Sequence, residues 1–156
     1  MDTLTKRRLG LCIAALTLNL LFIWGNSLMP GHISATISRF VGTVLSFLFP
    51  GDGAGALPTG EGILRKIAHV LEFCSLGFVL SALLYLLKKP FFFSLFPGIF
   101  TGAVDECIQL LVPGRGPHIR DVGIDTLGVI AGIGIFTIAL AVYRHRAQKF
   151  LEETNE

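Results

Sequence analysis

Long apolar segments dominate the pattern of hydrophobic and polar positions along this chain. A helix that crosses a lipid bilayer needs about 20 mostly apolar residues, and four segments meet this requirement. They are residues 9–28, 67–87, 91–112 and 122–143. The pattern therefore predicts four membrane-spanning helices, and we expect them to form a single domain that covers residues 1–156.

A fifth apolar segment, residues 33–49, has a different pattern. Its apolar positions recur at helical spacing along one side, whereas Ser34, Ser38 and Arg39 fall elsewhere. The segment is short and amphipathic, so we predict a helix that lies at the membrane interface and does not cross it. The expected fold class is an all-α integral membrane protein: a four-helix transmembrane bundle with an extra interfacial amphipathic helix between spans one and two.

The amino-acid composition excludes several other classes of protein. Hydrophobic residues make up 52% of the chain and charged residues only 15%, against about 25% charged in an ordinary soluble domain. A soluble enzyme of this size would need more polar surface, and a disordered chain would contain fewer apolar side chains. The net charge of +2 is too small to indicate a nucleic-acid partner. The odd number of cysteines does not suggest a disulfide framework.

The basic residues indicate how the spans are oriented. With the N-terminus in the cytoplasm, more of the 13 Lys and Arg residues lie on the cytoplasmic side than outside. The cytoplasmic set is Lys6, Arg7, Arg8, Lys88, Lys89, Arg144, Arg146 and Lys149. Because short cytoplasmic segments carry an excess of Lys and Arg, we predict that both termini are cytoplasmic.

Polar and ionisable side chains occur inside three of the predicted spans, where they are costly and are candidates for a functional site. They are His69 and Glu72 in the second span, Asp105, Glu106 and Gln109 in the third, and Asp121 and Asp125 in the fourth. Because consecutive spans alternate in direction, these residues are expected at one depth, in the outer leaflet. Arg115, in the loop before the fourth span, is expected beside them.

Two of these positions have competing interpretations. Adjacent residues on a helix point about 100° apart, so we do not expect Asp105 and Glu106 to face one centre. We assign Glu106 to the site because it shares a helix face with Gln109, and we expect Asp105 to pair with a basic residue of the next helix. Asp121 is well placed to cap the start of the fourth span, whereas Asp125 lies beyond the cap.

At these residues the sequence resembles the VanZ-like family of small membrane proteins, named for a member linked to resistance to the glycopeptide teicoplanin. The resemblance extends from the first span to the end of the fourth. Its motifs are Lys66-x-x-His69-x-x-Glu72-Phe73, Asp105-Glu106-x-x-Gln109, Pro113-Gly114-Arg115 and Asp121-Val122-x-x-Asp125-x-x-Gly128-x-x-x-Gly132. Two positions depart from the usual pattern: Phe73, where Tyr is common, and Asp125, where Asn is common. The resemblance implies a bacterial cell-envelope protein, and we expect a multi-pass protein of the bacterial cytoplasmic membrane.

The first functional hypothesis is a polar pocket in the outer leaflet that binds a membrane lipid or a lipid-linked cell-wall precursor. Arg115 would bind a phosphate or carboxylate group, and such binding would alter susceptibility to a glycopeptide antibiotic, which is itself a candidate partner. The predicted substrate-binding residues are Lys66, Gln109, Arg115 and Asp121.

The alternative is an intramembrane hydrolase or transferase that acts on a lipid-linked envelope substrate. Its candidate catalytic residues are His69, Glu72, Glu106 and Asp125. Their nitrogen and oxygen atoms suit a divalent cation as cofactor, which would activate a bound water. A purely structural role for His69 and Glu72, either an interhelical hydrogen bond or an ion pair between Glu72 and Arg115 that locks the bundle, is equally compatible with the sequence. A transporter is disfavoured because the spans show no inverted repeat.

Overall fold

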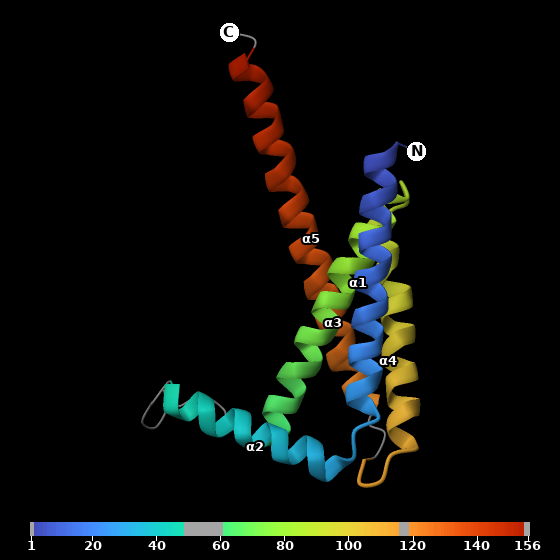
Figure 1. Ribbon diagram of the computed structural model, residues 1–156, viewed down its shortest axis with the longest axis vertical. Coiled ribbons are helices and arrows are strands. Elements are labelled where there is room, and N and C mark those ends of the chain that lie inside the picture. Colours follow the sequence, from blue (N-terminus) through green and yellow to red (C-terminus); the bar gives the residue numbers. More distant parts are fainter. Residues whose placement is uncertain (1, 49–60, 116–118, 155–156) are drawn as a thin grey trace.

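The computed structural model is built of helices throughout the residues that it describes, which are 2–48, 61–115 and 119–154. Figure 1 shows the arrangement of these helices. In chain order they are α1 (Thr3–Ser27), α2 (Gly31–Leu48), α3 (Glu61–Leu86), the short 3₁₀ helix η2 (Phe91–Ser94), α4 (Leu95–Leu110) and α5 (Ile119–Thr154). The predicted all-α fold class is confirmed.

Four helical segments in the described part of the chain are long and apolar enough to cross a membrane, as predicted. They are Thr3–Ser27, Gly62–Leu86, Phe91–Leu110 and Ile119–Glu153. The first, second and fourth begin earlier than predicted, because Lys and Arg residues beside these spans are good helix formers. Hydropathy marks where the apolar segment starts, whereas the helix itself continues into the polar sequence that precedes it.

Helix α5 also continues well past its predicted span, which ends at residue 143. Figure 1 shows its C-terminal part projecting beyond the other helices. This extension is polar, and Lys149 Nζ lies 3.7 Å from Glu153 Oε1, one helical turn away. Pairs at this spacing stabilise an exposed helix by about 0.2–0.5 kcal/mol, so this pair contributes to the continuation of the helix past the apolar sequence.

The third predicted span is not one continuous α-helix. Its first residues form η2, and α4 begins only at Leu95. Pro97 has no backbone N–H to donate to the carbonyl of Phe93, so the regular α-helical ladder cannot include that carbonyl. The chain takes a tighter 3₁₀ turn there. The prediction of a helix over 91–112 missed this break because all of these residues are compatible with an apolar span.

Figure 1 shows both ends of the chain at one end of the bundle and α2 at the opposite end. Helix α2 runs crosswise to the four long helices, which is the orientation expected of an amphipathic helix at a membrane surface. Its apolar side chains include Ile37, Phe40 and Val41, all of them exposed in the isolated chain.

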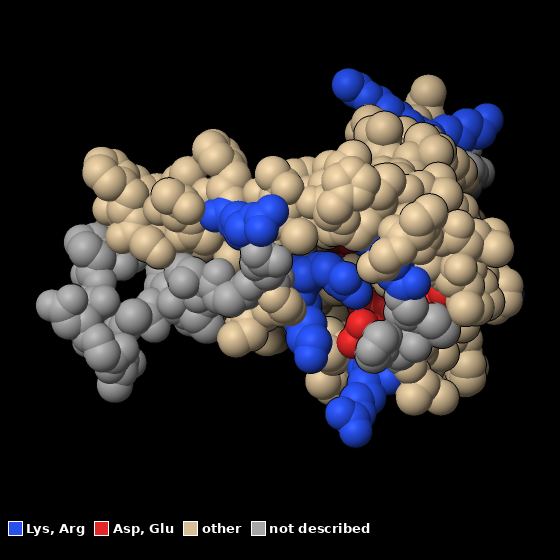
Figure 2. All heavy atoms as spheres, turned by 90° about the horizontal axis from the view of Figure 1, so that it is seen from below, with Lys and Arg blue, Asp and Glu red and all other residues tan. Residues whose placement is uncertain are grey.

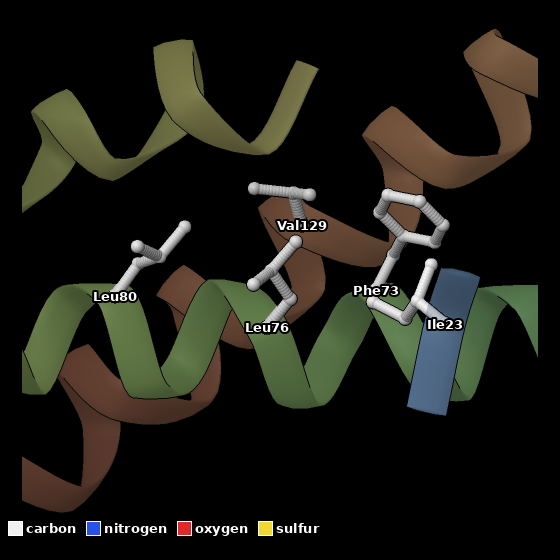
Figure 3. Close-up of a cluster of buried hydrophobic side chains, with 5 residues drawn as sticks. All are labelled: Ile23, Phe73, Leu76, Leu80 and Val129. Atoms are coloured by element: carbon white, nitrogen blue, oxygen red, sulfur yellow. The ribbon is translucent and has the colours of Figure 1, made fainter. Parts of the chain in front are cut away.

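The buried core is small and centres on α3. Ile23 of α1, Phe73, Leu76 and Leu80 of α3 and Val129 of α5 form one apolar cluster, and Figure 3 shows these side chains converging between the helices. Many other large apolar side chains are exposed, as expected for helices whose outer faces contact lipid.

Glycines bring α3 and α5 into close contact. A Cβ atom at Gly128 would lie only 2.7 Å from the Val70 carbonyl oxygen, and one at Gly132 would overlap the Cys74 carbonyl oxygen. From the other side, a Cβ at Gly77 would overlap the backbone of Val129. Small residues of this kind allow membrane helices to approach closely. This contact fixes the polar residues of α3 relative to those of α5.

Candidate functional site

A cavity of about 350 Å³ lies between α2 and α3, with the end of α1 and the segment after α4 beside it. Its apolar lining comes from α2 and α3 and includes Ile37, Val41, Leu45, Leu64, Ile67 and Leu71. Its polar lining includes Asn26, Ser34, Ser38, Arg65, His69, Glu72 and Arg115. An apolar cavity with a few convergent polar groups is typical of a small-molecule site.

Charged side chains gather at this end of the bundle. Figure 2 views the molecule from this end and shows Lys and Arg side chains around a small group of acidic side chains. Arg65 NH2 lies 3.8 Å from Asp121 Oδ2 and joins the start of α3 to the start of α5. Asp121 was expected to cap α5, but the helix begins at Ile119, so Asp121 lies in its first turn. An acidic residue there is favoured by the helix dipole.

A tight turn places Arg115 at the cavity. The Arg115 N–H donates to the Val112 carbonyl at 3.2 Å, and Gly114, the third residue of the turn, has a φ of 77°. Proline followed by glycine is typical of a type II turn, which needs a positive φ at its third residue. The Gly31 N–H donates to the Pro113 carbonyl at 3.4 Å. The turn therefore also holds the start of α2 in place.

The guanidinium of Arg115 is partly desolvated. Burial and the nearby Arg65 guanidinium lower the pKa of Arg115 from its ordinary value, while the carboxylates of Asp105 and Glu72 act in the opposite direction. Because an arginine pKa is ordinarily above about 12, the side chain keeps its charge. Its Nε atom is buried without a hydrogen-bond partner among the described residues. Arg115 therefore lines the cavity and keeps one buried donor without a partner in the described part of the chain.

Glu72 is held by α1. Asn26 Nδ2 donates to Glu72 Oε1 at 2.7 Å, while Glu72 Oε2 is buried with no hydrogen-bond partner in the described part of the chain. Among the described residues, no ion pair joins Glu72 to Arg115. The bond from Asn26 of α1 to Glu72 of α3 is an interhelical hydrogen bond, which is the other form that the structural interpretation allowed. One oxygen of Glu72, a residue that lines the cavity, is therefore left without a donor.

A buried cluster lies beside the cavity and consists of His69 from α3, Asp105 from α4 and Asp125 from α5. One nitrogen or oxygen atom from each side chain lies within 4.8 Å of the other two. Asp105 is 0% and Asp125 only 1% exposed. His69 Nδ1 lies 3.4 Å from Asp125 Oδ1. We call this group the His69–Asp105–Asp125 cluster.

Asp105 is in this cluster, contrary to the expectation that it pairs with a basic residue of the next helix. Ser27 Oγ donates to Asp105 Oδ1 at 2.5 Å, and Gln109 Nε2 donates to Asp105 Oδ2 at 2.8 Å. The prediction for Asp105 assumed that only one narrow face of α4 is buried. Because α4 contacts α1, α3 and α5, adjacent positions on it can both be buried, and Glu106 is only 6% exposed.

The remaining predicted site residues occupy different places. Lys66 is exposed and does not line the cavity. Gln109 supports Asp105 and is absent from the cavity lining. Glu106 is buried close enough to act electrostatically on Arg115, but it does not belong to the buried cluster. The structure therefore brings together His69, Glu72 and Arg115 at the cavity, with Asp125 directly behind His69.

Several polar residues of this region were not among the predicted site residues: Asn26, Ser27, Arg65, and Ser34 and Ser38 of α2. Asn26 and Ser27 interrupt the apolar sequence at the end of α1. Because α1 ends at the same end of the bundle where α3 begins, the alternation of span directions already places both residues at the depth of the site. Polar residues near a span end were the signal that could have identified them.

Comparisons with known proteins gave one family match. A family model described as VanZ/LLP1 matches residues 11–140, which is most of the chain. Neither the curated proteins nor the solved structures gave a significant match.

Proposed function

The chain belongs to the VanZ/LLP1 family, and we propose that it binds an anionic amphiphile of the cell envelope, either a membrane lipid or a lipid-linked cell-wall precursor. The observation that carries this proposal is the combined lining of one cavity. Apolar side chains of α2 and α3 line it together with two guanidinium groups, those of Arg65 and Arg115. An amphiphile with an anionic head group has the same two parts.

The apolar lining suits a hydrocarbon chain. The cavity volume of about 350 Å³ is near the lower end of the range of roughly 300–1,000 Å³ that is usual for small-molecule sites. It therefore accommodates a head group and the first part of a chain. The rest of the chain would extend into the bilayer between α2 and α3.

The polar lining suits a head group with both an acidic and a neutral polar part. Arg115 offers a charged donor for a phosphate or carboxylate oxygen, and Arg65 lies on the same cavity. Glu72 offers an acceptor oxygen for a hydroxyl or amide. Cell-envelope lipids and lipid-linked precursors contain both kinds of group.

The predicted orientation determines in which leaflet of the membrane this binding would occur. With both termini in the cytoplasm, the cavity lies in the outer leaflet of the cytoplasmic membrane, where cell-wall precursors meet glycopeptide antibiotics. A protein that binds the precursor there would alter glycopeptide susceptibility without breaking a bond. The binding and the orientation are tested separately below.

The experiment is to purify the protein in mild detergent and to identify the lipids that it retains by mass spectrometry. Arg115→Gln is expected to lower retention of the anionic lipid at least about tenfold, because a hydrogen bond to a charged group contributes about 1.5–3 kcal/mol. Arg120→Gln is the matched control, since Arg120 is exposed and does not line the cavity. Equal retention in the wild type and both variants would contradict the proposal.

A second pair of variants tests the apolar lining. Val41→Trp fills the cavity from α2 and is expected to reduce lipid retention with Arg115 intact, whereas Phe40→Trp changes a neighbouring side chain that does not line it. In cells that express each variant, teicoplanin tolerance is expected to follow lipid retention. If Val41→Trp and Arg115→Gln leave both retention and tolerance unchanged, the proposed function is wrong.

A further inference from the structure

Two buried carboxylates in the His69–Asp105–Asp125 cluster have an oxygen each within 4.8 Å of the other, and the proposed lipid binding does not use them. We propose that this cluster binds one divalent transition-metal ion of the Zn²⁺ or Mn²⁺ type. Its ligands would be one imidazole nitrogen of His69 and one carboxylate oxygen each from Asp105 and Asp125. The site would join α3, α4 and α5 inside the membrane-spanning part of the bundle.

The spacing of the three groups fits a small metal ion. Two ligand atoms at about 2.1 Å from a tetrahedral ion lie about 3.4 Å apart. His69 Nδ1 and Asp125 Oδ1 are separated by 3.4 Å, and all three ligand atoms lie within 4.8 Å of one another. Small rotations of the Asp105 or Asp125 side chain would close the remaining distance.

Asp125 points to a missing ligand. Its side chain is 1% exposed, and apart from the 3.4 Å contact between its Oδ1 and His69 Nδ1, neither of its carboxylate oxygens has a hydrogen-bond partner among the described residues. The Nδ1 atom of His69 is likewise buried without one. Buried carboxylates are ordinarily paired or coordinate metals. An ion bound by both residues would satisfy these atoms together.

Asp105 is oriented as a metal ligand would be. Ser27 and Gln109 donate one hydrogen bond to each of its two oxygens. A carboxylate accepts about four hydrogen bonds, so lone pairs remain for an ion. Hydrogen bonds of this kind fix the direction of a metal-binding carboxylate. Gln109 Nε2 also donates to Ser27 Oγ at 3.3 Å, and this bond holds the two donor side chains in place relative to each other.

Charge and donor type favour a particular class of ion. A divalent cation neutralises the two carboxylates, whereas a protonated His69 would balance only one of them. An imidazole nitrogen suits Zn²⁺ and other first-row metals, while Mg²⁺ and Ca²⁺ prefer sites made only of oxygen. Three protein ligands leave a coordination position open. Because His69 also lines the cavity, and given the proposed lipid binding, a head-group oxygen is the natural ligand for that position.

The test begins with the wild-type protein, purified without chelator for elemental analysis. Chelator-treated protein is then titrated with Zn²⁺, Mn²⁺ and Mg²⁺ by calorimetry. We expect one Zn²⁺ or Mn²⁺ per chain, at least tenfold tighter than Mg²⁺, and a higher melting temperature with the ion bound. Absence of saturable Zn²⁺ and Mn²⁺ binding by the wild type would overturn the proposal, whatever the variants do.

The variants locate the ion. Asp125→Asn and Asp105→Asn are expected to weaken binding by at least the roughly 10–100-fold that loss of a supporting contact causes. Asp121→Asn is the matched control for metal binding, because Asp121 precedes Asp125 by one turn and contacts Arg65 instead. Equal binding by wild type and Asp125→Asn would overturn the proposal. Should the Asn variants fail to fold, His69→Gln is measured in their place, and its unchanged binding has the same meaning.

These outcomes are separable from those of the lipid experiment. Arg115→Gln removes a donor at the cavity and no ligand of the cluster, so it is expected to lose the lipid and keep the ion. An ion that is retained when no lipid binds would overturn only the proposed function. Lipid binding without saturable metal binding would overturn only the metal site.

Discussion

Ser27 is a single hydroxyl on which the geometry of the buried cluster depends. It donates to Asp105 at 2.5 Å and is fully buried. Hydrogen bonds to charged groups contribute about 1.5–3 kcal/mol in soluble proteins, and those inside membrane proteins average less. We therefore expect Ser27→Ala to lower the free energy of unfolding by about 1–2 kcal/mol, measured by titration with a denaturing detergent.

Thr17 provides the comparison on the same helix. Its hydroxyl is exposed and donates to the Ile13 carbonyl within α1, so Thr17→Ala is expected to change stability by less than about 0.5 kcal/mol. Similar losses for Ser27→Ala and Thr17→Ala would mean that the bond to Asp105 does not contribute more than an ordinary surface hydroxyl.

The sequence allowed most of the polar residues that meet at this end of the bundle to be predicted, but not the choice between neighbouring positions on a helix. His69, Glu72, Arg115 and Asp125 were identified because an ionisable residue in or beside an apolar span is rarely incidental. Helical geometry alone could not show that Asp105 joins His69. That depends on how many helices surround α4, which is a property of packing between segments distant in the sequence.

At the level of the helices, the close contact between α3 and α5 depends on a glycine of α5. A Cβ atom at Gly132 would overlap the Cys74 carbonyl oxygen of α3 and approach the Phe78 backbone nitrogen at 2.7 Å. The two helices must separate to admit it, so we expect Gly132→Ala to destabilise the protein by about 1–3 kcal/mol. Thermal unfolding in detergent measures the change.

Gly134 is the matched control, because a Cβ atom there would meet nothing within 4 Å. Alanine favours a helix over glycine by about 1 kcal/mol, so Gly134→Ala is expected to leave stability unchanged or slightly increase it. If both variants behave alike, α3 and α5 are not in the close contact described here.

The helices themselves were predictable because apolar length and amphipathic period are local properties. Four spans and the extra helix α2 follow from them directly. The break at η2 does not, because it depends on one missing N–H, that of Pro97. The extension of α5 was also missed. The apolar sequence ends at Tyr143, but the polar residues after it still favour a helix, and the ion pair between Lys149 and Glu153 supports that helix.

For the molecule as a whole, the site residues come together because consecutive helices run in opposite directions. Polar residues near the end of α1, the start of α3, the end of α4 and the start of α5 meet at one end of the bundle because each span reverses the last. This convergence could be predicted from the sequence. A polar pocket was also predicted, but its position between α2 and α3 was not. That position needs α2 folded against α3, and the turn at Gly114 that holds the start of α2 gives no hydropathy signal.

The orientation of the bundle in the membrane decides which leaflet the cavity serves. Both termini lie at one end and α2 at the other, so two labelled positions are sufficient to test it. His32 is exposed near the start of α2, and Gln148 is exposed near the end of α5. Each would be replaced by Cys in a background whose native cysteines, Cys12, Cys74 and Cys107, are changed to Ala.

The excess of Lys and Arg at the end that carries the termini predicts that this end is cytoplasmic. A membrane-impermeant maleimide is therefore expected to label His32→Cys in intact cells and to label Gln148→Cys only after permeabilisation. The reverse pattern would place the cavity in the cytoplasmic leaflet, because the two positions lie at opposite ends of the same bundle. The proposed ligand would then have to be an anionic lipid of the inner leaflet, and a role in glycopeptide susceptibility through a precursor exposed outside would be excluded.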